Sequence, residues 1–322
     1  MKKKYKPLVS IVCPAYNIEK YLPETIDCVL NQTWEKWELI ICDDGSTDET
    51  GKIADKYEES DSRIKVIHQL NSGLPAAARN SAAEKVKGEL IAFLDGDDKW
   101  EPEKLEAQVN YLKKHPEFGS VHTSYDLIGD QDRIDFLKNM WEWTNHDVAN
   151  FKDLLLKKAR LHISSLMIYS ELFSKHGGFD EDPDLKGVED YDFILRIAAE
   201  KPIAHIKKVL SHYRILKKSV SHNKDYNLYG KSLLLLQKYQ KLGLLKDPEV
   251  IKQRKAEIIY SRGIDSLYHS GGSFRMDFWK AFKINPSNLK IAITFFFCWI
   301  PGPVLRPWLK TLLSIKNKLL VG

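Results

Sequence analysis

Residues 88–98 read GELIAFLDGDD, and this stretch decides the fold class. Leu90–Leu94 is an apolar run of the length of a buried strand, and three carboxylates follow it at Asp95, Asp97 and Asp98. Clustered carboxylates raise one another's pKa unless a cation lies among them, and hard oxygen ligands suit Mg²⁺ or Mn²⁺. The stretch therefore predicts a strand that ends in a metal site, with an acidic turn before the next helix as the alternative.

Strand and helix signals alternate through the rest of the first 125 residues. Apolar runs predict further strands at Leu8–Cys13, Glu38–Cys42, Ile64–His68 and Ser120–Ser124. Helical spacing and start signals predict helices at Tyr21–Gln32, Ser46–Tyr57 (with Ser46 and Glu49 as a capping box), Pro75–Val86 and Trp100–Lys114. This alternation predicts an α/β fold, a mainly parallel sheet flanked by helices on both faces.

Polar sequence follows four of the predicted strands at their carboxyl ends, where such sheets bind ligands. These stretches are PAYN at 14–17, DDGS at 43–46, a loop reaching NSG at 71–73, and DGDD at 95–98. The carboxylate of Asp44 can accept hydrogen bonds from a base or ribose, although a turn followed by a helix cap also explains DDGS. Arg79 lies in the first turns of the helix after NSG, where phosphate is favoured, with a surface arginine as the alternative.

Downstream of these loops, the sequence EDYD at 189–192 offers a carboxylate as a general base. Acidic residues opening a helix are the alternative, because they stabilise its N-terminus. Three histidines, at positions 162, 212 and 222, are candidate ligands or acceptor contacts, with structural or surface roles as the alternative.

Taken in order, these motifs resemble the family-2 inverting glycosyltransferases of the GT-A fold. The matching pieces run from Val9 to about Phe193 and are VSIVCPAYN, LNQTWEKWELIICDDGSTDET, NSGLPAAARNSA, GELIAFLDGDD, GGFDED and EDYDF. The resemblance implies a GT-A-type nucleotide-binding sheet, a nucleotide-sugar donor expected to be UDP-linked, and a divalent cation, Mn²⁺ or Mg²⁺. It also implies a saccharide or lipid-linked acceptor in cell-surface polysaccharide synthesis.

The resemblance assigns the nucleotide site residue by residue. The nucleoside pocket is expected to be lined by Pro14, Ala15 and Tyr16, with Asp44 contacting the base. Arg79 is expected near the diphosphate.

The resemblance also assigns the reacting groups. Asp95 and Asp97 match the D-x-D motif that holds ribose and cation, and Asp98 is a third candidate ligand because the match within DGDD is ambiguous. Asp190 matches the catalytic base, with Glu189 beside it, so the implied reaction is one in-line displacement that inverts the sugar anomeric centre. A loop that closes over donor or acceptor is expected around Tyr213, Arg214, Ser221 and His222.

Charge is unevenly divided along the chain. Residues 203–322 hold 22 Lys and Arg against 6 Asp and Glu, whereas residues 1–202 hold 27 against 38. From about Tyr226 the sequence is basic, leucine-rich and helical in pattern. The expected domains are therefore a catalytic domain at 1–225 and a basic helical region at 226–322, with a polyanionic surface as a candidate partner.

The C-terminal region contains an apolar segment, IAITFFFCWI at 291–300. It is too short to span a membrane before Pro301 and Pro303 interrupt it. Its aromatic residues, Trp299 among them, and the flanking lysines suit a membrane interface instead. The expected location is cytoplasmic, peripheral on the inner face of a membrane, with packing on the catalytic domain as the alternative.

Other features narrow the classes of function. The cysteines at 13, 28, 42 and 298 form no C-x-x-C pair and indicate buried, reduced thiols, and MKKKYKP at the start lacks the features of a signal peptide. A non-catalytic nucleotide- or carbohydrate-binding module that retains the fold is the main alternative. A nucleotidyltransferase is disfavoured because no Gly-rich loop follows Leu8–Cys13, and no nucleic-acid partner is expected because the aromatic residues of the tail do not interleave with arginine.

Overall fold

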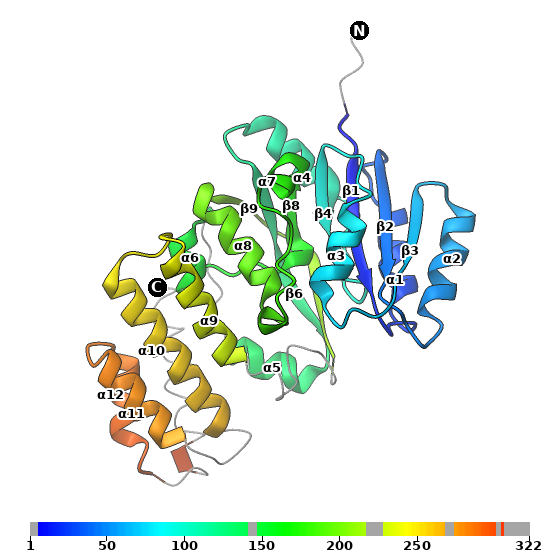
Figure 1. Ribbon diagram of the computed structural model, residues 1–322. Helices are drawn as coiled ribbons and strands as arrows, with labels where there is room; N and C mark the ends of the chain where they lie inside the picture. Colours follow the sequence, from blue (N-terminus) through cyan, green and yellow to red (C-terminus); the bar gives the residue numbers. More distant parts are fainter. Residues whose placement is uncertain (1–5, 141–146, 217–227, 268–273, 301–303, 306–322) are drawn as a thin grey trace. The chain divides into compact units, whose positions relative to one another are not determined.

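The chain divides into two compact units in the computed structural model, which describes residues 6–140, 147–216, 228–267, 274–300 and 304–305 (Figure 1). The first unit comprises residues 1–131, 144–154 and 159–222, and the second comprises residues 132–143, 155–158 and 223–322. Each unit has a hydrophobic core of its own.

The first unit is built on a mixed sheet. Its described strands are β1 (Val9–Ala15), β2 (Trp37–Asp43), β3 (Ile64–His68), β4 (Leu90–Phe93), β5 (Lys99–Trp100), β6 (Ser120–Gly129), β7 (Val148–Ala149), β8 (Leu166–Tyr169) and β9 (Ile203–Ile215). Their order is β3-β2-β1-β4-β8-β6-β9-β5, with β7 paired to β9. The first four strands are parallel, as predicted, and β8 adds to β4 in the antiparallel direction.

Helices cover both faces of this sheet (Figure 1). They are α1 (Leu22–Leu30), α2 (Thr50–Ser60), α3 (Pro75–Ala83), α4 (Lys104–Lys114), α6 (Phe151–Leu155), α7 (Ser170–Lys175) and α8 (Glu189–Glu200), with short 3₁₀ turns η1 (Ile163–Ser165) and η2 (Pro183–Leu185). Alternate side chains of a strand point to opposite faces. On β4, Ala92 joins the core under α1, α2 and α4, whereas Phe93 packs edge-on against Phe179 and Phe193 on the other face. The α/β fold class is therefore confirmed.

Two of the predicted helix starts are wrong. Ser46 does not cap the second helix, because its hydroxyl accepts a hydrogen bond from the Asn17 N–H at 3.0 Å and ties the loops after β1 and β2 together; α2 begins at Thr50. Trp100 is not helical either. It pairs with Ser211 in the ladder between β5 and β9, its indole N–H donates to the Ser164 carbonyl at 2.7 Å, and α4 begins at Lys104.

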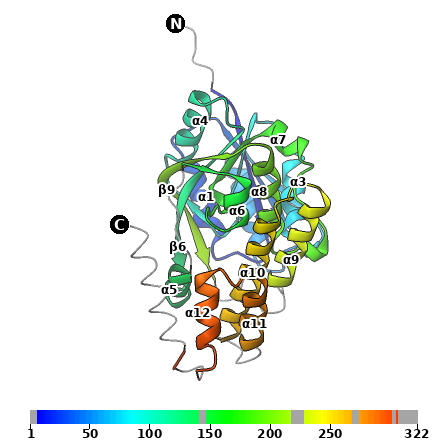
Figure 2. The ribbon, with the colours of Figure 1, turned by 90° about the vertical axis from the view of Figure 1, so that its left-hand side faces the viewer.

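The second unit is helical where it is described. It contains most of α5 (Gln131–Met140), and α9 (Leu228–Lys241), α10 (Pro248–Asp265), α11 (Phe274–Ile284) and α12 (Leu289–Phe297). Figure 2 shows α10, α11 and α12 packed side by side. A Cβ at Gly263 of α10 would come 2.7 Å from the Phe278 ring, so this glycine lets α11 pack closely against α10. Among the described residues, no helix is both long enough and apolar enough to cross a bilayer.

Candidate active site

The DGDD loop after β4 lies directly against the end of β1. A Cβ at Gly96 would come 2.9 Å from the Pro14 carbonyl oxygen and 2.4 Å from Cδ1 of Ile18, so a larger residue would push the two loops apart. The Thr25 hydroxyl of α1 lies 2.9 Å from the Gly96 carbonyl oxygen and 2.8 Å from that of Asp98. These contacts place the acidic loop beside the predicted nucleoside pocket.

The predicted nucleoside residues meet at the ends of β1 and β2. The Asp44 N–H donates to the Ala15 carbonyl at 2.9 Å, and the Tyr16 side chain is 48% exposed, which leaves its ring available to stack on a base. The Asp44 carboxylate is buried and accepts hydrogen bonds from the Gln69 amide at 2.6 Å and from both the N–H and the hydroxyl of Ser72 at 3.0 Å. Asp44 therefore fixes the loop after β3, and its contact with a base stays a prediction.

Arg79 joins the two acidic motifs. Its guanidinium donates to Oδ1 of Asp95 from Nε at 3.2 Å and from Nη2 at 2.7 Å, and from Nη1 to Oε1 of Glu189 at 3.2 Å. The arginine is 5% exposed, so these charge-assisted bonds form in a desolvated site. The other oxygen of Glu189 accepts the Gly187 N–H. DGDD and EDYD are thereby held side by side although they are distant in the sequence.

Asp98 is held by Ser164, which lies outside the predicted motifs, and by Arg214, which was expected in a closing loop. Its Oδ2 accepts the Ser164 hydroxyl at 2.5 Å, and its Oδ1 accepts the Arg214 N–H at 2.8 Å. The Ser164 hydroxyl in turn accepts the Asp95 N–H at 3.1 Å. Ser164 therefore braces both ends of the acidic loop, and nothing in the surrounding HISS sequence signals that role.

The acidic loop is electrostatically unfavourable without a cation. Burial, followed by the Asp95 charge, raises the pKa of Asp97 to about 7. Burial, followed by the charge of Asp97, raises the pKa of Asp98 well above its usual value. Since a bound cation would favour the ionised forms, these carboxyl groups are ones that a cation would stabilise.

Three ligand atoms converge beside this loop. One atom each from Asp95, Asp98 and His162 lie within 4.8 Å of one another, and Asp97 is not part of this group. Nδ1 of His162 is buried without a hydrogen-bond partner, and burial lowers the pKa of this imidazole to about 4, so the ring is neutral near pH 7. Two carboxylates and a neutral imidazole nitrogen fit Mn²⁺ and similar cations. The predicted ligand roles of Asp95, Asp97 and Asp98 stay predictions.

Asp190 lies at the start of α8 and is partly exposed, whereas Glu189 is buried. Burial of the carboxyl, followed by the charge of Glu189, raises the pKa of Asp190 to about 6. Oδ1 of Asp190 accepts the Tyr191 N–H at 2.7 Å. A carboxylate with a raised pKa, next to a partner already paired with arginine, has the properties of a general base.

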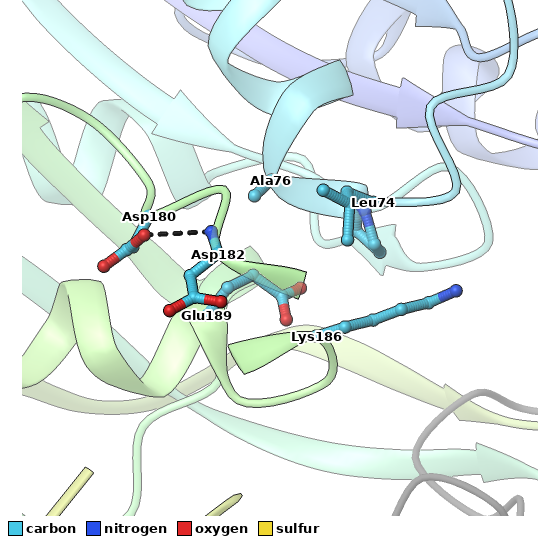
Figure 3. A pocket seen from close by; sticks show the side chains of 7 residues that line it. Leu74, Ala76, Asp180, Asp182, Lys186 and Glu189 are labelled. Atoms are coloured by element: carbon cyan, nitrogen blue, oxygen red, sulfur yellow. Dashed lines mark hydrogen bonds between the residues drawn. The ribbon is translucent and has the colours of Figure 1, made fainter. Parts of the chain in front are cut away.

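A shallow pocket adjoins Glu189 on the side of α3. It is lined by Leu74, Pro75, Ala76, Asp180, Asp182, Lys186 and Glu189. Figure 3 shows the acidic side chains across from the first residues of α3. Asn80 of α3 holds the GGFDED loop in place, because its amide group exchanges hydrogen bonds of 2.9 Å with the backbone of Phe179. The start of α3, the GGFDED loop and Glu189 of EDYD therefore share one pocket.

The remaining candidates are placed as follows. Tyr213 stacks on the ring of His162 at 4.0 Å between centroids, and Arg214 also donates from Nε to the Asp97 carbonyl at 2.7 Å. His212 bridges the carboxylates of Asp126 and Glu101, which is a structural role. Ser221 and His222 lie outside the described residues.

A parallel sheet half with acidic loops at its carboxyl ends, joined to a second half in which strands pair in both directions, defines a protein of the GT-A type. The model of glycosyl transferase family 2 matches residues 10–175, just over half of the chain. The chain belongs to glycosyl transferase family 2.

Individual proteins support this placement. TuaG of Bacillus subtilis strain 168, whose name assigns it as a glycosyltransferase to teichuronic acid biosynthesis, is 34% identical over 68% of this chain and 84% of its own. The fold is similar to that of Staphylococcus aureus TarS residues 1–349 in complex with UDP-GlcNAc, with a TM-score of 0.63 and 18% identity over 96% of this chain and 88% of that one. It is also similar to the mannosyltransferase PcManGT of Pyrobaculum calidifontis in complex with GDP-Man and Mn²⁺, with a TM-score of 0.57 and 18% identity over 97% and 87% of the two chains.

Proposed function

We propose that this protein is a cation-dependent inverting glycosyltransferase that moves a sugar from a UDP-sugar to a hydroxyl of a saccharide or lipid-linked acceptor in cell-surface polysaccharide synthesis. The observation that carries the proposal is the bridge from Asp95 through Arg79 to Glu189, which sets the acidic loop beside the Asp190 carboxylate. The name of TuaG supports the polysaccharide class, and TarS in complex with UDP-GlcNAc supports a UDP-linked donor.

Donor and cation would occupy the edge formed by the ends of β1, β2 and β4. Tyr16 would stack on the base, and the carboxylates of the acidic loop, Asp95 and Asp98 with Asp97 beside them, would hold the cation. A cation at this place supplies positive charge that stabilises a diphosphate leaving group. Arg79 would act mainly by fixing Asp95 and Glu189, because each of its three nitrogens already donates to one of these two carboxylates.

Asp190 would remove the proton of the acceptor hydroxyl. The hydroxyl oxygen then attacks the anomeric carbon on the face opposite the leaving nucleoside diphosphate, which inverts the configuration. Glu189 would keep Asp190 in position from within the ion pair with Arg79. The pocket in Figure 3 offers acidic side chains that can bind sugar hydroxyls, and it is lined by Glu189, the neighbour of this base in the chain, which suits a sugar acceptor.

The proposal is tested by a thermal-shift screen of nucleotide-sugars with and without Mn²⁺, followed by transfer to short saccharide acceptors. A UDP-sugar is expected to raise the melting temperature more with Mn²⁺ than without it, and to be consumed when an acceptor is added. Binding of nucleotide-sugars without hydrolysis or transfer, over a range of acceptors, would favour the non-catalytic binding module instead.

A pH profile follows from the raised pKa of Asp190. A general base works only when it is ionised, and burial raises its pKa to about 6, so kcat/KM is expected to fall as the pH drops below about 6. The fall should approach tenfold per pH unit on the acid side. A profile that stays flat down to pH 4.5, with the protein still folded, would contradict the assignment.

The second unit carries an exposed aromatic face that we propose contacts a membrane. Its most exposed large apolar side chains on and beside α11 and α12 are Met276, Trp279, Leu289, Phe296, Phe297, Trp299 and Val304. Lys283 lies 4.2 Å over the ring of Trp279, so positive charge accompanies this face. Aromatic rings next to lysines suit the headgroup region of an anionic bilayer.

Replacing Phe296, Phe297 and Trp299 together with serine is expected to weaken binding to phosphatidylglycerol vesicles by more than about tenfold, since each buried ring contributes roughly 1.5–3 kcal/mol. The measurement is co-sedimentation of the full chain with vesicles. The control replaces Leu242 and Leu244, which are also exposed in this unit but follow α9, and should leave binding unchanged. Equal vesicle binding by both variants would refute the assignment of this face.

A further inference from the structure

We propose that the imidazole of His162 is a direct ligand of the divalent cation, so that this site prefers Mn²⁺ to Mg²⁺. The proposal deepens the proposed function, on which it rests, by naming a ligand from outside the acidic motif. His162 precedes β8, in a segment that none of the quoted motifs covers. It therefore adds a nitrogen donor to a site otherwise made of carboxylate oxygens.

Nδ1 of His162 lacks a hydrogen-bond partner among the described residues. The atom is buried and has no hydrogen-bond partner, which is costly for a polar group. Oδ2 of Asp98 lies 3.5 Å from it, too far for a hydrogen bond. Adjacent ligands of a metal with bonds of about 2.1 Å lie roughly 3 Å apart, so 3.5 Å is close to the separation expected of two ligands of one ion. An ion would satisfy the nitrogen and both carboxylates together.

The imidazole ring of His162 is held in place by its neighbours. Tyr213 stacks on it with centroids 4.0 Å apart and planes inclined by 26°. The carbonyl of His162 accepts hydrogen bonds from the Ser165 N–H at 2.9 Å and the Ser165 hydroxyl at 2.6 Å, so the backbone is fixed as well. A ring locked by stacking and by its backbone loses little further freedom when it binds a metal.

Hydrogen-bond donors orient the two carboxylates that would bind the ion with His162. Ser164 donates its hydroxyl proton to Oδ2 of Asp98, and Arg79 donates to Oδ1 of Asp95, which leaves Oδ2 of Asp95 for an ion. Donors of this kind orient ligating carboxylates in metal sites. One short segment, 162–164, thus supplies both a ligand and a group that orients another ligand.

The donor atoms of the site determine which divalent cation it prefers. Mg²⁺ favours oxygen ligands and retains its waters, whereas imidazole suits transition metals. With one nitrogen and two carboxylates, Mn²⁺ gains a bond that Mg²⁺ gains poorly. The preference should therefore depend on His162 alone among the histidines of the described chain.

The test uses the full chain with Mn²⁺ alone as the probe. Pulsed EPR of bound Mn²⁺ is expected to show nitrogen modulation that changes when the protein is labelled with ¹⁵N-histidine, a measurement that needs no variant. His162→Gln should abolish this modulation and weaken Mn²⁺ binding by at least about tenfold, as losses around metal sites do, while Mg²⁺ binding changes by less than about threefold. His115→Gln, at a half-exposed histidine after α4, is the matched control and should change neither.

Mn²⁺ that binds without histidine modulation, or modulation that persists in His162→Gln, would overturn the proposal and leave the proposed glycosyl transfer standing. A protein that transfers sugar but does not bind Mn²⁺, with or without UDP, would overturn it too and would remove the cation from the proposed mechanism. Equal loss of Mn²⁺ and Mg²⁺ binding in His162→Gln would contradict the selectivity.

Discussion

Asp190→Asn is expected to lower kcat by about 10³-fold, within the range that a general base contributes, while the Kd of the UDP-sugar stays within about twofold. The asparagine has nearly the same shape, so it preserves packing at the start of α8, but it cannot take a proton. The measurements are steady-state transfer to a saccharide acceptor and calorimetric titration of the donor in the presence of Mn²⁺.

The neighbouring carboxylate provides the matched control. Glu189→Gln removes a charge that is paired with Arg79, so its expected effect falls on stability and on the position of Asp190, and the melting temperature should drop more than in Asp190→Asn. If Glu189→Gln abolished turnover and Asp190→Asn did not, the two residues would have exchanged roles. If neither reduced turnover, the base would have to be sought elsewhere.

The first four strands of the sheet could be predicted because each is encoded by a local run of apolar residues. Ile64–His68 occurs where the apolar run placed it, and DGDD directly follows β4. The start of α2 could not be predicted, because the Ser46 hydroxyl is used by Asn17 from another loop. The strand conformation of Trp100 could not be predicted either, because it depends on pairing with β9, more than a hundred residues away in the chain.

In the candidate site, too, the residues could be identified from local motifs, whereas their contacts depend on segments distant in the sequence. The motifs identified which carboxylates are present, and their place at the strand ends follows from sheet topology. That Arg79 links Asp95 with Glu189 depends on α3 bringing its arginine to the start of α8, which spacing does not encode. Ser164 carries no chemical signature in the sequence, and His162 had only its residue type, so neither could be ranked before the structure placed it beside Asp98.

Arg79→Met is expected to destabilise the first unit by about 3–5 kcal/mol, because it leaves Asp95 and Glu189 ionised in a buried site without their shared partner. For a unit of this size that corresponds to a fall in melting temperature on the order of 10 °C, measured by calorimetry. Arg79→Lys keeps the charge but cannot donate to both carboxylates through a planar fork, so its loss should be intermediate. Arg63→Met, at a half-exposed ion pair with Asp61, should cost no more than about 1 kcal/mol.

Two further measurements distinguish between two roles of Arg79: an ion-pairing role that joins Asp95 with Glu189, and a role in packing alone. Because the uncompensated charge on Asp95 lies at the proposed cation site, Mn²⁺ should raise the melting temperature of Arg79→Met by more than it raises that of the unmodified protein. Adding Glu189→Gln to Arg79→Met removes one of the two stranded charges and should restore part of the lost stability, since the two side chains interact directly. If the two substitutions were instead strictly additive and Mn²⁺ stabilised both proteins equally, Arg79 would be a packing residue, and the link between the acidic loop and the base would have no energetic basis.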